Sequence, residues 1–546
     1  MHAVIKDGKI LLYDSYIFKE SIKEIPGRQW HPEERAWSVP ISQQNIETLD
    51  LLGCELSDEL TDIRQGLVLS NTVDADTLFS APLKVSPYEH QLKGYNFACR
   101  SMGMIGNNGL SPGFALLMEM GTGKTITSIA IVGKAYLTGK IKRLLILAPK
   151  SIVAVWEDEF SKFADFPYSL SVLTGTSAKK AEQLKTIPHK GLEVAVVNYD
   201  SISLIEKELT AWHPDFLICD ESSKIKNPTA KMSKAAYRIA KGCKYRLILT
   251  GTPIQNNPLD FFSQYKVLDD RIFGKSFYAF KNEYAVLGTY NQPIGWRKLP
   301  ELVKKAHSIA FRVTKAEALD LPDTIDEIRP VTLEDKAQKL YKAFVKESYM
   351  ELSKGEVTAT NILTRLLRLQ QITGGFIRPD EESERYEQVS SSKLDALEDI
   401  IDTAISENKK LVVIARFIPE IREICRMLDK KKIKYGHICG EVKDRAAEVD
   451  AFQNNPECMV FVGQLQTVSM GLTLTAANTM VFYSLSYNFA DYSQAKARIH
   501  RIGQKNNCLY IHLVVKNTVD ETVLKALEQK ENIAAKIVDD WRSILK

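Results

Sequence analysis

The stretch LLMEMGTGKTITSIA, which runs from Leu116 to Ala130, decides how the rest of the chain is interpreted, because it raises the question of polyphosphate binding. The strict phosphate-binding loop consists of Gly, four further residues and then Gly-Lys-Ser/Thr. Met118 stands in the place of the first glycine. The sequence therefore meets only the second half of the pattern.

That second half still supplies what a polyphosphate needs, namely backbone N–H groups at a helix N-terminus, a cation and a hydroxyl for Mg²⁺. Lys124 provides the cation and Thr125 the hydroxyl, and the turn before them consists of Met120, Gly121, Thr122 and Gly123. The apolar run GFALLM precedes this turn as a strand should, and ITSIAIVGKAYL follows it with a helical pattern. The alternative is a glycine turn that caps an ordinary helix.

The composition is that of a large globular protein with several domains, because 546 residues are 45% hydrophobic. The net charge of +4 permits a nucleic-acid partner without arguing for one. The eight cysteines are scattered along the chain, so they indicate neither a disulfide framework nor a zinc site.

The sequence has no apolar run near the roughly 18 residues of a membrane span, and its first residues lack the layout of a signal peptide. We therefore expect no membrane partner and a cytoplasmic location, associated with the nucleoid or, for a viral source, in the host cytoplasm. We also expect a monomer, and the sequence does not identify a protein partner.

Two series of short apolar runs predict an α/β fold with two parallel sheets, because continuous runs of this kind are typical of strands buried on both faces. The first series consists of LLILAP (144–149), VAVVNY (194–199), DFLICDE (215–221) and YRLILTGT (245–252). The second consists of LVVIAR (411–416), CMVFVG (458–463), TMVFYS (479–484) and CLYIHLVV (508–515). We divide the chain into a small N-terminal α+β unit, a first α/β domain, a mostly helical region and a second α/β domain with a C-terminal helix, at 1–80, 81–256, 257–377 and 378–546.

Two acidic residues follow one of these runs. Asp220 and Glu221 stand where the apolar run ends, so a carboxylate there can hold Mg²⁺ opposite Thr125. We assign the metal to Asp220, and Glu221 can then orient or deprotonate an attacking water. A polar loop after a strand is the alternative.

The segment QAKARIHRIGQ (494–504) predicts cations for the charge that develops on a transferred phosphoryl group. Gln494, Arg498 and Arg501 follow an i, i+4, i+7 spacing, which places them on one face of a helix. A basic helix face exposed to solvent is the alternative.

Taken in order over about residues 82–530, these motifs resemble those of the Swi/Snf-type ATPases of helicase superfamily two. MEMGTGKT looks like the family's first motif, in which the superfamily does not require glycine at the position of Met118. DESSKIKN (220–227) looks like motif II, LTGTPIQNNPLDFF (249–262) like motif III and QAKARIHRIGQ like motif VI. The resemblance implies two RecA-like lobes that close on ATP and Mg²⁺, with Arg498 and Arg501 as arginine fingers.

Three further segments extend the resemblance to other site residues. PYEHQLKGYNF (87–97) is similar to the Q motif, which implies that Gln91 reads the adenine. LAPKSIVAVWEDEF (147–160) looks like motif Ia, which implies that Lys150 and Ser151 contact DNA phosphates. VSMGLTLTAANTMVFYSLSYN (468–488) resembles motif V, which implies that Gly471 lies near the nucleotide.

Two positions depart from the family pattern. Motif II normally ends in histidine where this chain has Ser223, and the tryptophan expected before Asn488 is Tyr487. Glu221 is retained, so hydrolysis is still expected.

The segment FKESIKEIPGRQWHPEERAWSVPI (18–41) resembles the HARP module of annealing helicases and fork-remodelling members of the family, in which the module binds branched DNA. The alternative is that Trp30 and Trp37 are only core aromatics of a small domain.

These observations predict an ATP-dependent DNA helicase or translocase that acts on duplex, forked or branched DNA and remodels forks or migrates branches. Two alternatives stay open. One is a duplex translocase that displaces bound proteins without exchanging strands, and the other is a nucleotide-gated DNA clamp with little turnover.

Overall fold

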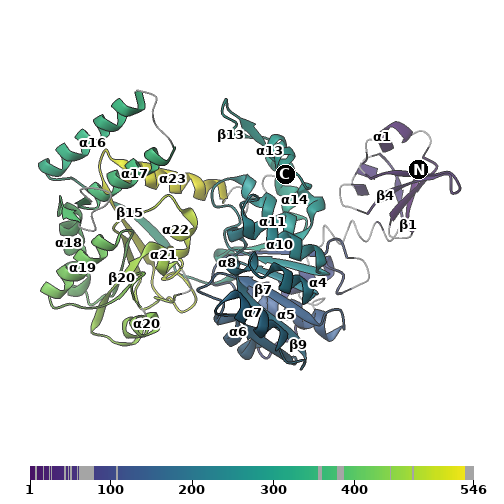
Figure 1. Ribbon diagram of the computed structural model, residues 1–546, viewed down its shortest axis with the longest axis horizontal. Helices are drawn as coiled ribbons and strands as arrows, with labels where there is room; N and C mark the ends of the chain where they lie inside the picture. The colour runs from purple at the N-terminus through teal and green to yellow at the C-terminus, as the bar shows by residue number, and fades with distance from the viewer. Residues whose placement is uncertain are drawn as a thin grey trace.

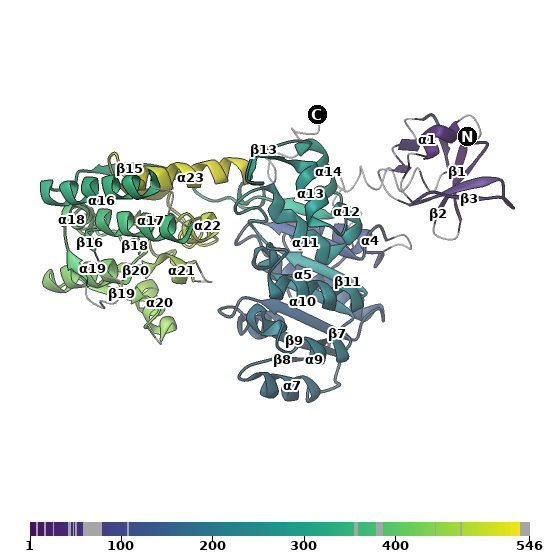
Figure 2. The same ribbon diagram turned by 45° about the horizontal axis from the view of Figure 1, so that its top comes forward.

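The protein contains two large sheets that lie side by side, each flanked by helices, and a small sheet formed by the first residues (Figures 1 and 2). The computed structural model describes residues 1–534 apart from 7–8, 16–17, 24, 26, 42–44, 47, 50–51, 58–59, 61–78, 106–108, 354–358, 378–385, 443 and 470–471. Among the helices in this described part of the chain, none has both the length and the apolar character needed to cross a membrane.

The first large sheet has seven parallel strands in the order β14-β6-β11-β10-β7-β9-β8. All four apolar runs of the first series form strands here, and GFALLM forms another. The bounds are β6 Gly113–Met118, β7 Arg143–Ala148, β8 Tyr168–Val172, β9 Leu192–Asn198, β10 Phe216–Asp220, β11 Tyr245–Leu249 and β14 Ala310–Val313. The helices that bear on the site are α4 Glu89–Ser101, α5 Lys124–Leu137, α6 Val155–Phe163 and α11 Phe261–Leu268.

The second large sheet has six parallel strands in the order β15-β22-β21-β18-β20-β19. Its bounds are β15 Thr324–Val331, β18 Leu411–Ala415, β19 Lys434–Ile438, β20 Cys458–Gln464, β21 Thr479–Phe482 and β22 Cys508–Val515. The accompanying helices include α16 Asp335–Ser353, α17 Ala359–Thr373, α18 Ser392–Ser406, α19 Ile418–Lys430, α20 Arg445–Asn454, α22 Phe489–Lys496 and α23 Val519–Ala534. The predicted fold class, with two parallel α/β sheets and a small N-terminal unit, is confirmed.

The region 257–377, predicted as mostly helical, contributes a strand to each large sheet. β14 pairs with β6 at one edge of the first sheet, and β15 pairs with β22 at one edge of the second. Both are edge strands with partly exposed faces, so their sequences AFRV and TIDEIRPV lack the continuous apolar character of the central strands. A further hairpin joins β12 Ala285–Leu287 to β13 Pro293–Trp296.

The small sheet has the order β3-β4-β2-β1-β5 and its own apolar core, which includes Ile10, Leu12 and Val39. Its bounds are β1 His2–Lys6, β2 Lys9–Tyr13, β3 Gln29–His31, β4 Ala36–Pro40 and β5 Glu55–Leu56, and helix α1 spans Lys19–Lys23. Trp37 packs against that core, whereas Trp30 is 43% exposed, with its ring centroid 5.3 Å from that of Trp37. Trp30 is therefore not a core aromatic.

A buried carboxylate lies in the first turn of α19. The Oε2 atom of Glu420 accepts hydrogen bonds from the Ser484 hydroxyl at 2.5 Å, from the Phe417 N–H at 3.0 Å and from the Arg416 N–H at 3.2 Å. Its Oε1 is buried without a hydrogen-bond partner among the described residues. Burial raises the pKa of Glu420 from 4.5 to about 7 despite these donors.

The Glu420→Gln variant is expected to gain stability relative to the wild type as the pH rises. The fold favours the protonated carboxyl, so the stabilisation by that proton is fully present below pH 4.5 and is lost as the pH approaches 7. Glutamine does not titrate, and the difference in unfolding free energy should shift by up to about 3 kcal/mol across this interval. Denaturant unfolding of both proteins at several pH values measures it. A difference that does not vary with pH would contradict the assignment.

Candidate functional site

The glycine turn connects the buried end of β6 to the N-terminus of α5. Met118 is still part of the strand and fully buried, so its position makes no demand for glycine. Gly121 and Gly123 have φ angles of 87° and 94°, which disfavour other residues. A Cβ atom on Gly123 would lie 2.1 Å from Nε2 of Gln91. The turn thus depends on the two glycines that the sequence retains.

Two side chains from α4 and its start hold this turn. Nε2 of Gln91 donates to the Thr122 carbonyl at 3.1 Å, and its Oε1 accepts from the Tyr88 N–H at 3.0 Å. Nε2 of His90 lies 2.7 Å from the same Thr122 carbonyl. Gln91 therefore contacts the glycine turn directly, and its reading of adenine stays a prediction. The sequence analysis did not identify His90.

Lys124 begins α5 and turns its ammonium back over the turn, where Nζ donates to the carbonyls of Met118 at 3.1 Å and Glu119 at 3.4 Å. Burial lowers the pKa of Lys124, while the carboxylates of Glu221 and Asp220 act in the opposite direction. The cation and the two acids predicted from separate segments therefore lie within electrostatic reach of one another.

The two acids stand at the carboxyl end of β10. Oδ2 of Asp220 accepts from the indole N–H of Trp156 at 3.1 Å, and Oδ1 accepts from the Glu221 backbone N–H at 2.9 Å. Burial, together with the charge of Glu221, raises the pKa of Asp220, which Lys124 opposes.

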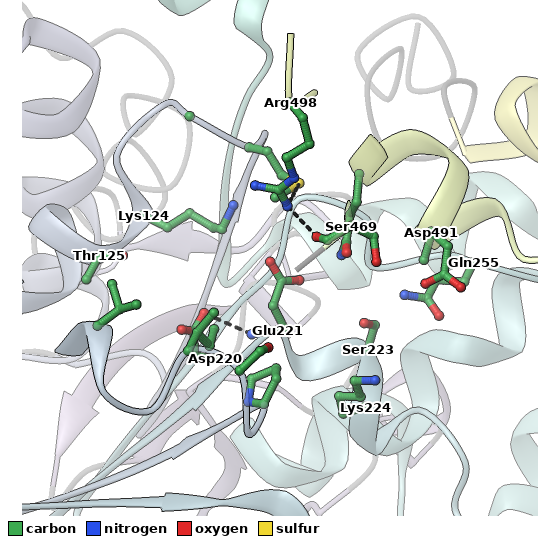
Figure 3. A pocket seen from close by; sticks show the side chains of 18 of the residues that line it. Lys124, Thr125, Asp220, Glu221, Ser223, Lys224, Gln255, Ser469, Asp491 and Arg498 are labelled. Atoms are coloured by element: carbon green, nitrogen blue, oxygen red, sulfur yellow. Dashed lines mark hydrogen bonds between the residues drawn. The ribbon is translucent and has the colours of Figure 1, made fainter. Parts of the chain in front are cut away.

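Glu221 itself has a φ angle of 48°, a strained conformation for a residue other than glycine. Its Oε2 atom is buried without a hydrogen-bond partner among the described residues. Figure 3 shows its carboxylate pointing toward the side chains of Lys124 and Arg498. A buried acceptor with no partner is costly in a folded protein, so this atom is suited to a group that binds there.

Gln494, Arg498 and Arg501 do not share a helix face, and this prediction was wrong. Helix α22 ends at Lys496, because the Arg498 N–H bonds to the carbonyl of Ala495 at 2.9 Å in a tighter turn. The carbonyl of Arg498 then accepts the Leu474 N–H at 3.0 Å, which replaces a continued helix.

The two arginines are nevertheless held close together in the loop after α22. Arg498 is 3% exposed and donates to the carbonyls of Ser469 and, at 3.3 Å, Leu472. Arg501 donates to the same Leu472 carbonyl at 3.2 Å and to the Thr473 hydroxyl at 2.8 Å. Burial and the neighbouring Arg501 lower the pKa of Arg498 to about 10. The two guanidinium groups are thus held by backbone carbonyls of the second α/β domain, which we call the second lobe; the domain with the sheet of β6 is the first lobe.

A pocket of about 460 Å³ is lined by residues of both lobes, with Arg498 but not Arg501 among them (Figure 3). From the first lobe it is lined by Met120, Gly121, Lys124, Thr125, Ser151, Trp156, Asp220, Glu221, Ser223, Lys224, Lys226 and Gln255, among others. From the second lobe it is lined by Ser469, Asn488, Ala490, Asp491, Gln494 and Arg498. Arg498 also lies 3.9 Å from the sulfur of Met120, across the gap between the lobes.

For three residues the structure does not confirm the role predicted from the sequence. Ser151 lines the pocket, although it was predicted to contact DNA, whereas Lys150 is exposed beside it and does not line the pocket. Gly471 lies outside the described residues, so the structure does not address its predicted role. The DNA contacts of Lys150 and Ser151 stay predictions.

The replacement of the motif II histidine by Ser223 does not leave motifs II and III unconnected. The hydroxyl of the preceding Ser222 donates to Oε1 of Gln264, on α11, at 2.7 Å. Nε2 of Gln264 in turn donates to the carbonyl of Pro253 at 2.8 Å. Ser222 and Gln264 are both fully buried, so hydrogen bonds through Gln264 join motif II to motif III.

The sequence analysis also missed Lys315, which follows β14 where the chain passes from the first sheet toward the second. Its backbone N–H donates to the carboxylate of Glu119, beside the phosphate-binding turn. Its Nζ donates to the carbonyl of His500 at 2.8 Å, beside the arginine loop. Burial lowers the pKa of Lys315 to about 8. Nothing in the local sequence could have indicated a contact with a segment so far along the chain.

The fold and the pocket define a two-lobed α/β protein in which a glycine turn, lysines and two acids of one lobe face a buried arginine of the other. The family description "SNF2-related domain" matches residues 90–374, and "Helicase conserved C-terminal domain" matches residues 392–503. The chain belongs to the SNF2-related family and carries a helicase C-terminal domain.

Individual relatives are more distant. An uncharacterized ATP-dependent helicase of Mycoplasma pneumoniae is 27% identical over 434 residues, which cover 78% of this chain and 40% of that protein. The SWI/SNF-related matrix-associated actin-dependent regulator of chromatin subfamily A-like protein 1 of Xenopus laevis is 28% identical over 453 residues, covering 81% of this chain and 43% of that protein. The solved SWI2/SNF2 ATPase core of Sulfolobus solfataricus in complex with dsDNA is 27% identical, with a TM-score of 0.41, over 85% of this chain and 95% of that one. The chain thus spans less than half the length of these two curated relatives.

Proposed function

We propose that the protein is an ATP-driven DNA motor, in which hydrolysis in the pocket between the lobes drives translocation on duplex or forked DNA. The observation that carries this proposal is the composition of the pocket. One lobe contributes a phosphate-binding turn, a lysine and two acids, and the other contributes a buried arginine. A site divided in this way can couple the state of the nucleotide to the arrangement of the lobes.

The residues have separate roles in hydrolysis. Lys124 and the N–H groups of the turn bind the terminal phosphates of ATP. Glu221, whose Oε2 has no protein partner, orients the attacking water and accepts its proton. Arg498 stabilises the charge that develops on the transferred phosphoryl group, and Arg501 acts beside it.

Mg²⁺ is the metal that fits the oxygen donors at this edge of the first sheet. Thr125 and Asp220, which both line the pocket, would hold it. When bound, it would neutralise charge on the phosphates.

Arg498 lines the pocket, and its Nε is buried without a hydrogen-bond partner among the described residues. Its guanidinium now donates to the carbonyls of Ser469 and Leu472 in its own lobe. An ATP phosphate carries more negative charge than a peptide carbonyl, so a bound nucleotide favours the arrangement in which Arg498 faces it. Closure of the lobes is therefore linked to ATP binding.

DNA is the proposed polymer partner because the chain belongs to a helicase-type family and carries exposed basic residues such as Lys150, two residues after the end of β7. Basic side chains contact the DNA phosphates, which carry no sequence information. We therefore infer that binding tolerates any sequence and weakens as salt concentration rises.

Fork remodelling or branch migration is the specific task that we propose, and it rests on the first 78 residues. Their HARP-like segment places an exposed Trp30 on a separate small sheet with its own core. A second DNA contact outside the two lobes suits a substrate with diverging arms. Displacement of proteins from duplex DNA is the alternative, because it would need only the two lobes.

Deletion of residues 1–78 tests this task. Phe79 must remain, because its backbone N–H and carbonyl bond to the side chain of Asn96 on α4 at 2.8 and 3.0 Å. We expect ATPase stimulation by linear duplex to persist and the affinity for forked DNA to fall by roughly 10², since a second site raises apparent affinity only where both sites engage together. Fluorescence anisotropy with both DNAs, alongside phosphate release, gives the comparison. Equal losses on linear and forked DNA would exclude a fork-specific role.

A further inference from the structure

Trp156 is a buried aromatic residue with a polar contact in the pocket. It lies in the first turn of α6, is 1% exposed and packs beside Phe160, with ring centroids 6.3 Å apart. Its indole N–H donates to Oδ2 of Asp220 at 3.1 Å. An indole N–H has no second proton to offer, so this carboxylate is its single polar contact.

Besides the pairing of β10 with β11, the described residues make three hydrogen bonds to Asp220 that involve a side-chain atom, and this is one of them. The other carboxylate oxygen accepts the Glu221 N–H at 2.9 Å, and the Asp220 backbone carbonyl accepts the Tyr199 hydroxyl at 2.7 Å. The Tyr199 hydroxyl holds the backbone and the Glu221 N–H holds Oδ1, whereas among the described residues the indole is the one donor to Oδ2. Loss of the indole N–H would therefore leave the carboxylate held by the Glu221 N–H at Oδ1 alone, with more freedom to rotate about its side-chain bonds.

The orientation of this carboxylate matters because it determines which lone pairs face the pocket. Some groups hydrogen-bond a metal-binding carboxylate without touching the metal. Removing such a group typically reduces metal affinity or activity by about 10- to 100-fold. Trp156 occupies that position with respect to Asp220. Trp156 is also one of the residues that line the pocket.

We propose that Trp156 is a positioning residue that holds Asp220 in the orientation required for Mg²⁺. The inference rests on the proposed function, because it takes Asp220 as the acid that binds the metal. Trp156 itself touches neither the metal nor the reacting atoms.

The Trp156→Phe variant of the full chain tests the inference, because it keeps an aromatic ring and removes the N–H donor. Equilibrium binding of a fluorescent ADP analogue is measured as a function of Mg²⁺ concentration and also in EDTA. We expect the Mg²⁺ concentration for half-maximal binding to rise by about tenfold or more. Affinity in EDTA should stay within about twofold of the wild type, because the phosphate-binding turn is untouched.

Trp212→Phe is the matched control. Trp212 is also buried in the first lobe, where the Arg143 guanidinium lies 5.6 Å from its ring centroid, and it does not line the pocket. This variant should leave both measurements unchanged. If Trp156→Phe fails to fold, benzothienylalanine at position 156 replaces only the N–H by sulfur and carries the same expectation.

Three outcomes would overturn the inference. If the wild type depends on Mg²⁺ and Trp156→Phe has the same dependence, or loses affinity equally in EDTA, Trp156 does not position Asp220. If wild-type binding is itself independent of Mg²⁺, the assignment of the metal to Asp220 fails as well, and with it part of the proposed function.

Discussion

The Glu221→Gln variant is expected to bind ATP about as tightly as the wild type and to hydrolyse it about 10² to 10⁴ times more slowly. Glutamine keeps the size of the side chain but cannot accept a proton from the attacking water. The strained backbone at this position, with a φ angle of 48°, imposes similar demands on both residues, so the turn should be preserved. Single-turnover hydrolysis and equilibrium ATP binding separate the two effects.

Glu157→Gln is the matched control, because Glu157 is an exposed carboxylate on α6 that does not line the pocket. It should hydrolyse ATP at the wild-type rate. If Glu221→Gln instead loses ATP affinity and thermal stability together, Glu221 has a structural role and the assignment of the base is wrong.

The Arg498→Ala variant is expected to lose about 10³ or more in turnover, the scale of a true arginine finger, with a much smaller change in ATP affinity. Arg498 reaches the pocket from the second lobe, whereas the turn and Lys124 that bind the ATP phosphates belong to the first lobe. Its removal should therefore slow hydrolysis, which follows ATP binding. Arg501→Ala should also lower turnover strongly, since both arginines share the Leu472 carbonyl. Steady-state ATPase and nucleotide binding are measured for both variants.

Arg426→Ala controls for the loss of a positive charge from the same lobe, because Arg426 is an exposed residue of α19 paired with Glu423 at 2.8 Å. Its turnover should equal that of the wild type. A loss of less than about tenfold in Arg498→Ala would mean that this arginine does not act on the transition state.

The central strands could be predicted from the sequence because burial on both faces demands continuous apolar residues. The runs that became β7, β9, β10 and β11 are of this kind. The edge strands β14 and β15 could not be predicted in this way, since solvent on one side permits polar residues. A region that supplies one strand to each sheet was therefore predicted as helical.

The candidate site likewise has residues that could be predicted from the sequence and residues that could not. Lys124, Asp220 and Glu221 follow predictable strands, so their meeting at one sheet edge follows from the parallel topology. The arrangement of Arg498 depends on a tertiary hydrogen bond between its carbonyl and the Leu474 N–H, which a helical spacing cannot reveal. The contacts of Trp156 and Lys315 likewise join segments that only the folded chain brings together.

The central claim is that the two lobes form one ATP site whose turnover responds to DNA. The most direct measurement is steady-state phosphate release by the full chain with MgATP, in the presence and absence of duplex DNA, for the wild type and for Lys124→Ala. We predict that DNA raises the wild-type rate several-fold and that Lys124→Ala hydrolyses ATP under neither condition, because the cation that contacts the phosphates is lost. A wild-type rate that does not respond to DNA, or hydrolysis that survives in Lys124→Ala, would contradict the account.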